Sequence, residues 1–287
     1  MAEHDLKLGE RGAIISISAY IILSILKLVV GYMSGSEALK ADGLNNSTDI
    51  IASVAVLIGL RVSQKPADED HRYGHWRAET VSSLVASFIM MTVGVSVLFQ
   101  SIISFFSNEA KTPDLLSAWT ALFAAVIMFF VYRFNLKLGK QINSQAVKAA
   151  AKDNLSDALV SIGTAIGIIG AQFQLPWLDP FIAVIIGLII CKTAWEIFWE
   201  ASHDLTDGFN EEELHHFEQI VLKVKGVKKL GSIKARKYGN RVVVDLVIFV
   251  NPDLNVRTSH HISDEVEKAL KDEGAVSDAH VHIEPSE

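Results

Sequence analysis

Cysteine is almost absent from the 287-residue sequence, and so are the marks of a cleaved leader. The single cysteine, Cys191, has no second thiol for an intrachain disulfide, and it lies in an apolar run, which favours a role as helix filler. The opening MAEHDLKLGERG has neither a basic n-region nor an A-x-A cleavage site. We therefore expect the first apolar run to be a retained helix and not a signal peptide.

Signatures of enzymes are also missing. The sequence has no HExxH and no Ser-His constellation, and the two acids of its fifth apolar run, Asp153 and Asp157, are not preceded by GxG. An intramembrane aspartyl protease, which would be expected to carry YD and GxGD signatures, is therefore disfavoured. We expect a protein that is not an enzyme, needs no cofactor and has no nucleic-acid partner.

Apolar residues are abundant in the first two thirds of the chain. Hydrophobic residues make up 50% of the sequence, and the mean hydropathy of +0.30 is high for a soluble protein. Runs of about 20 apolar residues can cross roughly 30 Å of hydrocarbon. Six such runs occur, at approximately residues 12–33, 37–62, 80–106, 114–134, 146–172 and 178–200. The sequence predicts a polytopic α-helical membrane protein, with six transmembrane helices in residues 1–206 that lie in the lipid bilayer.

Lysine and arginine are unevenly distributed over the predicted connections. SNEAKTP after the third run and AQFQLPW after the fifth hold one lysine between them, whereas the connections after the second and fourth runs are basic. Those basic residues are Arg61, Lys65, Arg72, Arg77, Arg133, Lys137, Lys140 and Lys148. Because basic loops remain on the cytoplasmic side, we expect a multi-pass protein of the cell (plasma or inner) membrane with both termini in the cytoplasm.

From residue 207 onward the composition is that of a soluble domain, in which charged residues dominate. Periodicity predicts a helix in residues 209–226, strands in 228–239 and 240–253 joined by a Gly-Asn turn, a helix in 256–274 and a last strand in 275–285. An SDEV start signal and a Gly stop mark the second helix. We predict that residues 207–287 form a cytoplasmic α+β ferredoxin-like (αββαβ) domain, with an antiparallel sheet and helices on one face.

Two pairs of polar residues interrupt the second and fifth apolar runs. Asn45 and Asp49 are four residues apart, as are Asp153 and Asp157, so each pair faces one side of its helix. The two helices run in opposite directions and rise by about 1.5 Å per residue. Asn45 and Asp157 are therefore expected at the same depth in the bilayer, as are Asp49 and Asp153. Four oxygen-bearing side chains can therefore meet near the bilayer midplane.

Three of those four side chains are carboxylates, which repel one another unless protons or a cation neutralise them. A divalent cation fits this need. The alternative is that Asn45 only hydrogen-bonds to a neighbouring helix and that the aspartates pair with Lys27 or Lys40. The cation is favoured because both lysines are expected nearer the outer surface, where long side chains snorkel. A monovalent cation and proton exchanger also remains open.

Together these features resemble the cation diffusion facilitator family. The resemblance is carried by the six membrane runs, NxxxD on the second, DxxxD on the fifth, the loop PADEDHRYGHWRAE and the terminal helix-strand-strand-helix-strand domain. It covers essentially the whole chain. It implies a homodimeric antiporter that binds a divalent metal from the cytoplasm and releases it outside in exchange for protons. Asn45, Asp49, Asp153 and Asp157 match the family's transport site.

The predicted ligands bear on which metal is transported. Zinc-transporting members of the family place His at the position of Asp153 and usually Asp at that of Asn45, and this sequence does neither. An all-oxygen site suits Mn²⁺, Mg²⁺ or Ca²⁺, whereas Zn²⁺ favours His and Cys. The NxxxD and DxxxD combination resembles the manganese-exporting branch. Mn²⁺ is therefore the predicted substrate, with Fe²⁺ as the nearest alternative and Zn²⁺ or Co²⁺ as further ones.

The resemblance implies a further metal position in the loop after the second run. Asp68, His71 and His75 match this position, and the spacing of the two histidines suits a pair of ligands if the segment is helical. Asp70 could replace Asp68. The alternative is a solvated loop whose His and Asp residues cap the third helix.

The terminal domain also carries candidate ligands. Strand alternation places His280, His282 and Glu284 on one face, which His261 of the preceding helix could approach. His261, His282 and Glu284 match positions that bind metal at the dimer interface of the family. The middle strand is apolar where relatives often supply a further His, so we do not expect the full binuclear site. A histidine cluster without metal is the alternative.

Function follows from the polar groups in the membrane. Metal and protons compete for the same carboxylates, and a site that opens alternately to each side turns this competition into exchange. Arg77 and Asp207 match a charge interlock across the dimer of the family, although a charge near a basic loop needs no such partner. A membrane-anchored metal sensor is the alternative of another class, but a passive anchor needs no acids at the midplane. We therefore expect a divalent metal cation/proton antiporter that exports Mn²⁺.

Overall fold

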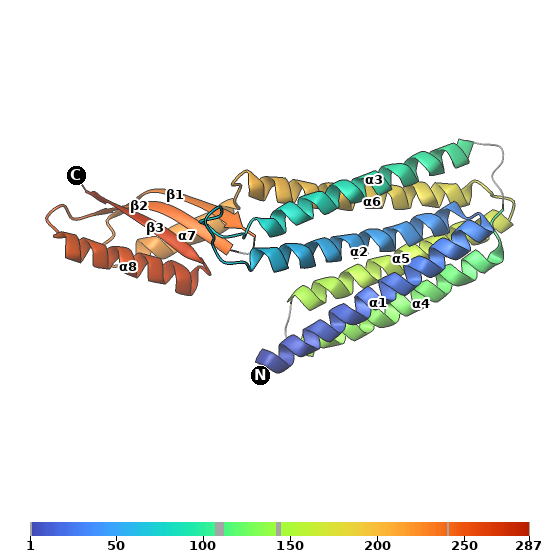
Figure 1. The fold of residues 1–287 in the computed structure, drawn as a ribbon, viewed down its shortest axis with the longest axis horizontal. Helices are drawn as coiled ribbons and strands as arrows, with labels where there is room; N and C mark the ends of the chain where they lie inside the picture. The colour runs from blue at the N-terminus through green and yellow to red at the C-terminus, as the bar shows by residue number, and fades with distance from the viewer. Residues whose placement is uncertain (1, 107–111, 142–144, 240, 287) are drawn as a thin grey trace. The chain divides into compact units, whose positions relative to one another are not determined.

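The computed structural model describes residues 2–106, 112–141, 145–239 and 241–286. Within these ranges, six long helices are followed by a smaller α+β domain (Figure 1). The helices are α1 (Ala2–Ser34), α2 (Glu37–Ser63), α3 (Ala78–Phe106), α4 (Leu115–Gln141), α5 (Gln145–Gln172) and α6 (Leu178–Leu205). The chain divides into two compact units, Met1–Val54 with Ala86–Glu196, and Ala55–Val85 with Ile197–Glu287.

Five helices in the described ranges are long and apolar enough to cross a membrane. Their spans are Ile14–Ser34, Ala78–Phe106, Leu115–Gln141, Ala150–Gln172 and Leu178–Leu205. The predicted helical membrane architecture is thus confirmed. Helix α2 coincides with the predicted second run, but it carries Lys40, Asp42 and Asp49 in its first two thirds, and its passage through the membrane stays a prediction.

Small and apolar side chains pack the helices of the first unit. Helix α4 packs against both α1 and α5 (Figure 1). Its Ala124 and Met128 are buried with Leu23 of α1 and Ala158 of α5. A second cluster joins α2, α3 and α6 and contains Ala41, Val97, Ala183, Ile186 and Ile190. Alanine at such contacts permits the close helix approach that is typical of membrane bundles.

The beginning of α2 is held by a residue of α6. The Ser36 Oγ accepts a hydrogen bond from the Leu39 N–H at 3.0 Å and donates one to Asp179 Oδ1 at 2.6 Å. Asp179 Oδ2 accepts hydrogen bonds from the N–H groups of Glu37 at 2.7 Å and Ala38 at 3.3 Å. The buried carboxylate of α6 therefore satisfies backbone donors that the start of a helix leaves unpaired.

The terminal domain has the predicted αββαβ order. Its elements are α7 (Glu211–Lys223), β1 (Lys229–Tyr238), β2 (Arg241–Val250), α8 (Val256–Glu273) and β3 (Asp278–Pro285). The strand order in the sheet is β1-β2-β3. Both helices and the sheet share one core, which includes Phe217, Ile220, Val244, Ile248, Val266 and Leu270.

Two local predictions for this domain are wrong. β1 and β2 are antiparallel, but β3 runs parallel to β2, because α8 connects them as a crossover that returns the chain to the same end of the sheet. Helix α8 begins at Val256, as the predicted range of 256–274 has it, but SDEV is not its start signal, because Asn255 caps the helix by accepting a hydrogen bond from the Thr258 N–H at 3.0 Å. Gly274 ends α8 as predicted. In the predicted Gly-Asn turn, Gly239 has a φ of +60°, and Asn240 lies outside the described residues.

Candidate metal centres

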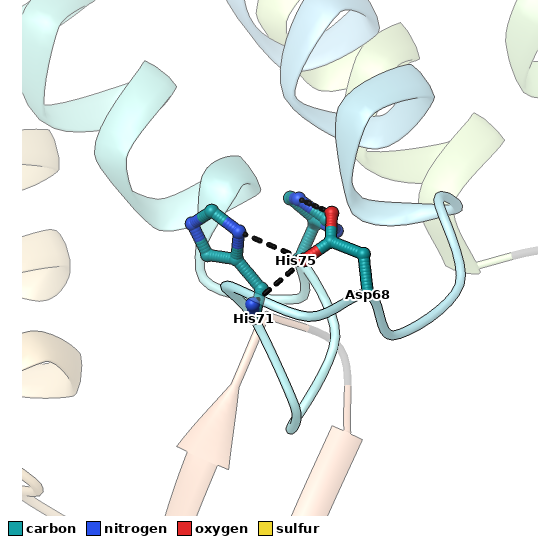
Figure 2. A group of neighbouring side chains, drawn as sticks. All are labelled: Asp68, His71 and His75. Atoms are coloured by element: carbon teal, nitrogen blue, oxygen red, sulfur yellow. Dashed lines mark hydrogen bonds and ion pairs between the residues drawn. The ribbon is translucent and has the colours of Figure 1, made fainter.

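Asp68, His71 and His75, here called the loop triad, lie together in the connection between α2 and α3 (Figure 2). Among the described residues, they are the one group of three His, Cys, Asp or Glu residues whose potential ligand atoms all lie within 4.8 Å of one another. His71 Nδ1 is 3.3 Å from Asp68 Oδ1, and His75 Nε2 is 3.4 Å from Asp68 Oδ2. Two imidazole nitrogens and a carboxylate suit Zn²⁺ or another transition metal.

A turn, and not a helix, brings the loop triad together. Residues 65–77 contain no helical residue, and Gly74 has a φ of +80°, which glycine adopts without strain. Asp68 Oδ1 accepts hydrogen bonds from the N–H groups of His71 at 2.7 Å and Asp70 at 3.1 Å. Asp70 thus supports the turn through its backbone, while Asp68 provides the carboxylate. The helix on which the spacing argument depended is not formed, but the two histidines still meet, with 4.3 Å between their ring centres.

The same turn sets the charge of Asp68. The backbone N–H of His71 stabilises the ionised carboxylate and lowers the pKa of Asp68 below its usual value, and the side chains of His71 and His75 contribute in the same direction. The carboxylate therefore carries its full charge in neutral solution. Its hydrogen bonds hold the turn itself, and none that the structure shows caps α3, which begins at Ala78.

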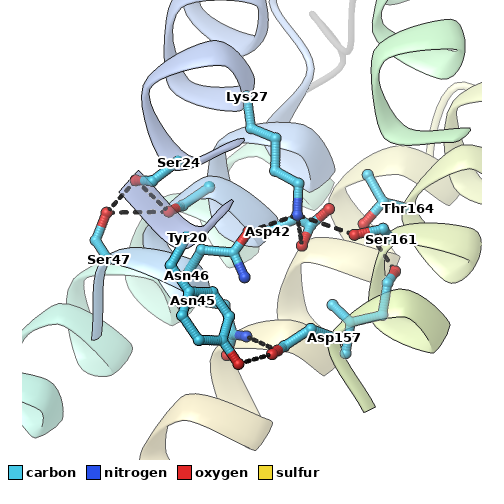
Figure 3. A network of polar contacts seen from close by, with 12 residues as sticks. Tyr20, Ser24, Lys27, Asp42, Asn45, Asn46, Ser47, Asp157, Ser161 and Thr164 are labelled. Carbon is cyan, nitrogen blue, oxygen red and sulfur yellow. Dashed lines mark hydrogen bonds and ion pairs between the residues drawn. The ribbon is translucent and has the colours of Figure 1, made fainter. Parts of the chain in front are cut away.

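In the first unit, Asn45 of α2 and Asp157 of α5 are in direct contact although 112 residues separate them in the chain. Asn45 Nδ2 donates to Asp157 Oδ1 at 3.0 Å, and the Tyr20 hydroxyl of α1 donates to Asp157 Oδ2 at 2.8 Å (Figure 3). All three side chains are buried. Three helices therefore meet at one carboxylate, in the place where the sequence predicts the transport site.

Asp49 and Asp153 lie on the same two helices, about one turn from Asn45 and Asp157. Asp49 Oδ2 is buried without a hydrogen-bond partner in the described part of the chain. Asp153 is exposed. The three carboxylates are not among the described groups whose ligand atoms all lie within 4.8 Å. Of the four residues of the predicted transport site, the structure thus brings Asn45 and Asp157 into contact. Asp49 and Asp153 are not drawn together with them into one compact group.

The lysines pair elsewhere. Lys27 Nζ forms an ion pair with Asp42 at 2.8 Å, and both side chains are completely buried. Lys40 pairs with Glu37 of its own helix at 2.6 Å.

Among the described residues, neither of these lysines forms an ion pair with Asp49, Asp153 or Asp157, so this half of the alternative is not what the structure shows. The other half, a hydrogen bond from Asn45 to a neighbouring helix, is present as the contact with Asp157. The expectation that Lys27 reaches the outer surface is wrong, because α2 and α5 supply acceptors for it inside the bundle.

Our sequence reasoning missed Tyr20 and the polar residues around it. Asn154 Oδ1 is a second acceptor for the Tyr20 hydroxyl at 3.0 Å, and Asn154 Nδ2 donates to Ser16 Oγ at 3.2 Å. Asn135 of α4 donates to the same Ser16 Oγ at 2.8 Å. A signal was present in the spacing of the polar residues of α1, which are Ser16, Tyr20, Ser24 and Lys27. Recurrence every three or four residues marks one polar face on an apolar helix.

The terminal domain brings together two of its three predicted ligands. His282 Nε2 and Glu284 Oε1 of β3 lie 2.9 Å apart. His261 instead faces Glu265 of its own helix α8, with 3.6 Å between Nε2 and Oε1. Within one described chain, the three predicted ligands do not form a group within 4.8 Å. Val247 is paired with His282 in the sheet register, so the neighbouring strand places an apolar residue beside the two ligands.

Arg77 and Asp207, which match the family's charge interlock, are paired within one chain. Arg77 Nη2 is 2.6 Å from Asp207 Oδ1. The Arg77 guanidinium also lies 4.7 Å from the centre of the Tyr238 ring, a distance that allows a cation–π contact. The pair connects the residue before α3 to the segment after α6 within one chain, whereas the family resemblance implies an interlock between protomers.

Long apolar helices with buried polar residues such as Asn45 and Asp157, followed by an αββαβ domain, are the features of an integral membrane transporter. Residues 13–206 match the family domain described as cation efflux transmembrane domain, and residues 209–286 match that described as cation efflux protein, cytoplasmic domain. The chain belongs to the cation diffusion facilitator family, whose members are transporters and not enzymes. It is a multi-pass membrane protein with a cytoplasmic C-terminal domain.

Relatives align with the chain over nearly its full length. The manganese efflux system protein MneS of Bacillus subtilis (strain 168) is 58% identical over 99% of this chain and 98% of its own. The uncharacterized transporter YdbO of the same organism is 54% identical over the same shares. The manganese efflux system protein MneP, also from that organism, is 30% identical over 99% of each chain. The whole-chain resemblance predicted from the sequence is thus confirmed.

Proposed function

We propose that this chain exports Mn²⁺ from the cytoplasm in exchange for protons, by alternating access through a site of Asn45, Asp49, Asp153 and Asp157. The contact between Asn45 and Asp157 is the observation that carries the site, together with a buried oxygen of Asp49, about one turn away, that has no hydrogen-bond partner among the described residues. The metal is supported by MneS and MneP, which are named for manganese efflux.

Ligand chemistry supports the same metal. All four side chains offer oxygen, which Mn²⁺ accepts readily, whereas Zn²⁺ prefers imidazole and thiolate. A buried carboxylate oxygen without a partner, such as Asp49 Oδ2, is unfavourable until a proton or a cation neutralises it. We therefore rank Mn²⁺ first and Fe²⁺ second, followed by Zn²⁺ and Co²⁺.

Cation binding requires two changes in this arrangement. Asn45 donates its amide N–H to Asp157, so the amide has to rotate before its Oδ1 can reach a cation. Asp49 and Asp153 also have to approach Asp157. This closure is the binding step of alternating access, and the protons that the carboxylates exchange for the metal couple its export to proton entry.

We place the protein in the cell membrane as a homodimer, with both termini in the cytoplasm. Residues 1–206 form the transport domain and residues 207–287 the regulatory and dimerisation domain. The dimer is supported by the match of residues 209–286 to a domain named for dimerisation (ZT_dimer). The orientation is supported by the basic residues that follow the second and fourth apolar runs.

Two accessory metal sites belong to the proposal. The loop triad has its three ligands in place within one chain, so a transition metal fits it without rearrangement. His261, His282 and Glu284 do not meet within one chain. A metal there requires further ligands from a second protomer, which would couple cytoplasmic metal to the stability of the dimer.

Purified protein in liposomes tests the proposed function. Mn²⁺ uptake is measured under an imposed pH gradient, with Zn²⁺ and Fe²⁺ in parallel and Asp49→Ala as the inactive control. We expect proton-driven Mn²⁺ flux that the substitution removes. Equal or faster Zn²⁺ flux would contradict the choice of metal. No flux of any metal would favour the membrane-anchored sensor.

A further inference from the structure

Lys27 lies in the membrane-spanning part of α1 and belongs to none of the predicted metal sites. Its side chain is completely buried, and its ammonium contacts two other helices (Figure 3). Nζ donates to Asp42 Oδ1 at 2.8 Å and Asn46 Oδ1 at 2.6 Å on α2, and to Ser161 Oγ at 2.9 Å on α5. An ammonium group has three donors, so every one of them is used to join α1 to α2 and α5.

The buried ion pair of Lys27 and Asp42 is not explained by its contribution to stability. Removing two charges from water costs more than their attraction returns unless the geometry is very good, and apolar residues of similar volume often replace such pairs without loss of stability. Charged residues inside a membrane domain are rare for the same reason. Asp42 Oδ2 and Asn46 Nδ2 also lack hydrogen-bond partners among the described residues. Packing alone therefore does not explain why the chain has a lysine at this point.

On both helices that it joins, the Lys27 ammonium contacts a residue close in sequence to a residue of the predicted transport site. Asn46 follows Asn45 directly on α2, and Ser161 comes one turn after Asp157 on α5. The two helices that Lys27 links are thus the two whose side chains meet in the 3.0 Å contact between Asn45 and Asp157.

Helices α1 and α2 also approach each other closely at this level. A Cβ atom added to Gly43 of α2 would lie 3.0 Å from Leu28 Cγ of α1, so glycine permits the approach. Ser24 Oγ donates to the Gly43 carbonyl at 3.1 Å and lies 2.7 Å from Ser47 Oγ. Because apolar contact drives little helix association in lipid, small residues and polar contacts such as these hold α1 to α2.

We propose that Lys27 is a positioning residue for the transport site. Paired with Asp42, its ammonium holds α2 against α5, so that Asn45 and Asp157 present their oxygens to the same cation. The inference rests on the proposed function, because it takes Asn45 and Asp157 as ligands of the transported metal. Loss of the ammonium should therefore weaken cation binding even in a protein that folds.

Variants of the full-length protein separate positioning from folding. Lys27→Met leaves Asp42 as a buried unpaired charge, whereas Lys27→Met combined with Asp42→Asn removes both charges. Ser161→Ala keeps the ion pair and removes only the contact with α5. Lys40→Met is the matched control, because Lys40 pairs with Glu37 of its own helix.

Mn²⁺ binding to each purified variant is measured from the EPR signal of the free ion, and uptake into liposomes gives KM and Vmax separately. In the double variant we expect Kd and KM to rise about tenfold with a smaller change in Vmax, and in Ser161→Ala to rise about threefold. Lys40→Met should match the parent protein. A parental Kd in Ser161→Ala, or in a folded double variant, would overturn the proposal.

The proposed function can fail separately from this inference. If the parent protein binds Co²⁺ but neither binds nor transports Mn²⁺, the substrate is wrong. The variants are then compared by the absorption of bound Co²⁺, and the same loss of affinity in the double variant and in Ser161→Ala is expected. Parental Co²⁺ affinity in Ser161→Ala would overturn the role of Lys27 in that case as well.

Discussion

The loop triad and the transport site differ in how the chain assembles them. The loop triad comes from residues 68–75, and a turn holds it where 53% of the Asp68 side chain is exposed. The transport site joins residues that are 112 positions apart, and Asp157 is only 6% exposed. A site built from one short segment keeps its ligand geometry when the helices move, because its ligands do not come from different helices. A site shared between helices changes its ligand geometry when they move, which is what a transporter requires if it is to release its cargo.

The two sites also differ in ligand chemistry. The loop triad offers imidazole nitrogen as well as oxygen, and the four residues of the transport site offer oxygen as acceptor atoms. We therefore expect the two to prefer different metals and to respond differently to substitution.

The largest expected effect is that of Asp157→Asn. The substitution keeps the shape of the side chain but removes the charge at the carboxylate on which α1, α2 and α5 meet. We expect proton-driven Mn²⁺ uptake to fall by about a hundredfold or more. Ser156→Ala is the control, because its exposed Oγ donates a hydrogen bond to the Lys152 carbonyl of its own helix. Uptake at the parent rate in a normally folded Asp157→Asn variant would show that Asp157 is not a residue of the transport site.

Asp153→His should change the preferred metal. It introduces an imidazole where zinc-transporting members of the family carry one, and we expect the ratio of Zn²⁺ to Mn²⁺ uptake efficiency to rise about tenfold. The ratio of kcat/KM for the two ions is the measurement. Ser156→His, which adds an imidazole to an exposed neighbour on α5, should leave the ratio unchanged. An equal rise in both variants would mean that Asp153 is not a selective ligand.

Tyr20→Phe should weaken the site without abolishing it. The change removes the hydroxyl that donates to Asp157 at 2.8 Å, and hydrogen bonds to charged groups contribute enough to raise the KM for Mn²⁺ about tenfold. Tyr32→Phe is the control, since Tyr32 of α1 is 68% exposed. Equal KM values for the two variants would show that Tyr20 does not position Asp157.

His75→Ala should affect metal content more than transport. It removes one ligand of the loop triad, so we expect one transition metal fewer per chain by elemental analysis, while Mn²⁺ uptake changes by less than about threefold. His215→Ala, at an exposed histidine of α7, controls for the loss of an imidazole. A fall in uptake as large as that of Asp157→Asn would erase the distinction between the two sites.

The smallest expected effect is a pH-dependent one at Asp68. The His71 backbone N–H lowers the pKa of Asp68, so the stabilisation of the turn is present above the usual value near 4 and is lost as the pH falls through the lower folded value. Asp68→Asn should therefore lower the apparent Tm by about a degree at neutral pH, and the difference should vanish near pH 2. A difference that grows as the pH falls would contradict this assignment.

The length and period of apolar runs predicted much of this molecule. Helical spans and the αββαβ order follow from patterns that are local in sequence. The depth argument also placed Asn45 level with Asp157, because two antiparallel helices with the same rise share one bilayer, and the structure shows their hydrogen bond. The direction of β3 was missed because it depends on the crossover through α8 and not on the strand itself.

The residues that the buried polar side chains contact could not be predicted from the sequence. By length alone, Lys27 lies near the outer end of its helix, and its burial depends on acceptors that α2 and α5 bring from 15 to 134 residues away. Tyr20 looks like an ordinary aromatic residue of an apolar run until Asp157 is placed beside its hydroxyl. Both misses concern polar atoms whose partners become known only when the helices are packed.

The cap on α2 has a mechanical consequence. Asp179 of α6 holds the backbone of Glu37 and Ala38, which makes this end of α2 a pinned joint and the rest of the helix a lever. Measured from Glu37 at about 1.5 Å per residue, Asn45 lies about 12 Å and Asp49 about 18 Å along the lever. Any tilt about the joint displaces Asp49 half again as far as Asn45. If the four predicted ligands bind the cation as proposed, such a tilt moves Asp49 away from Asp153 and Asp157 before it moves Asn45 as far.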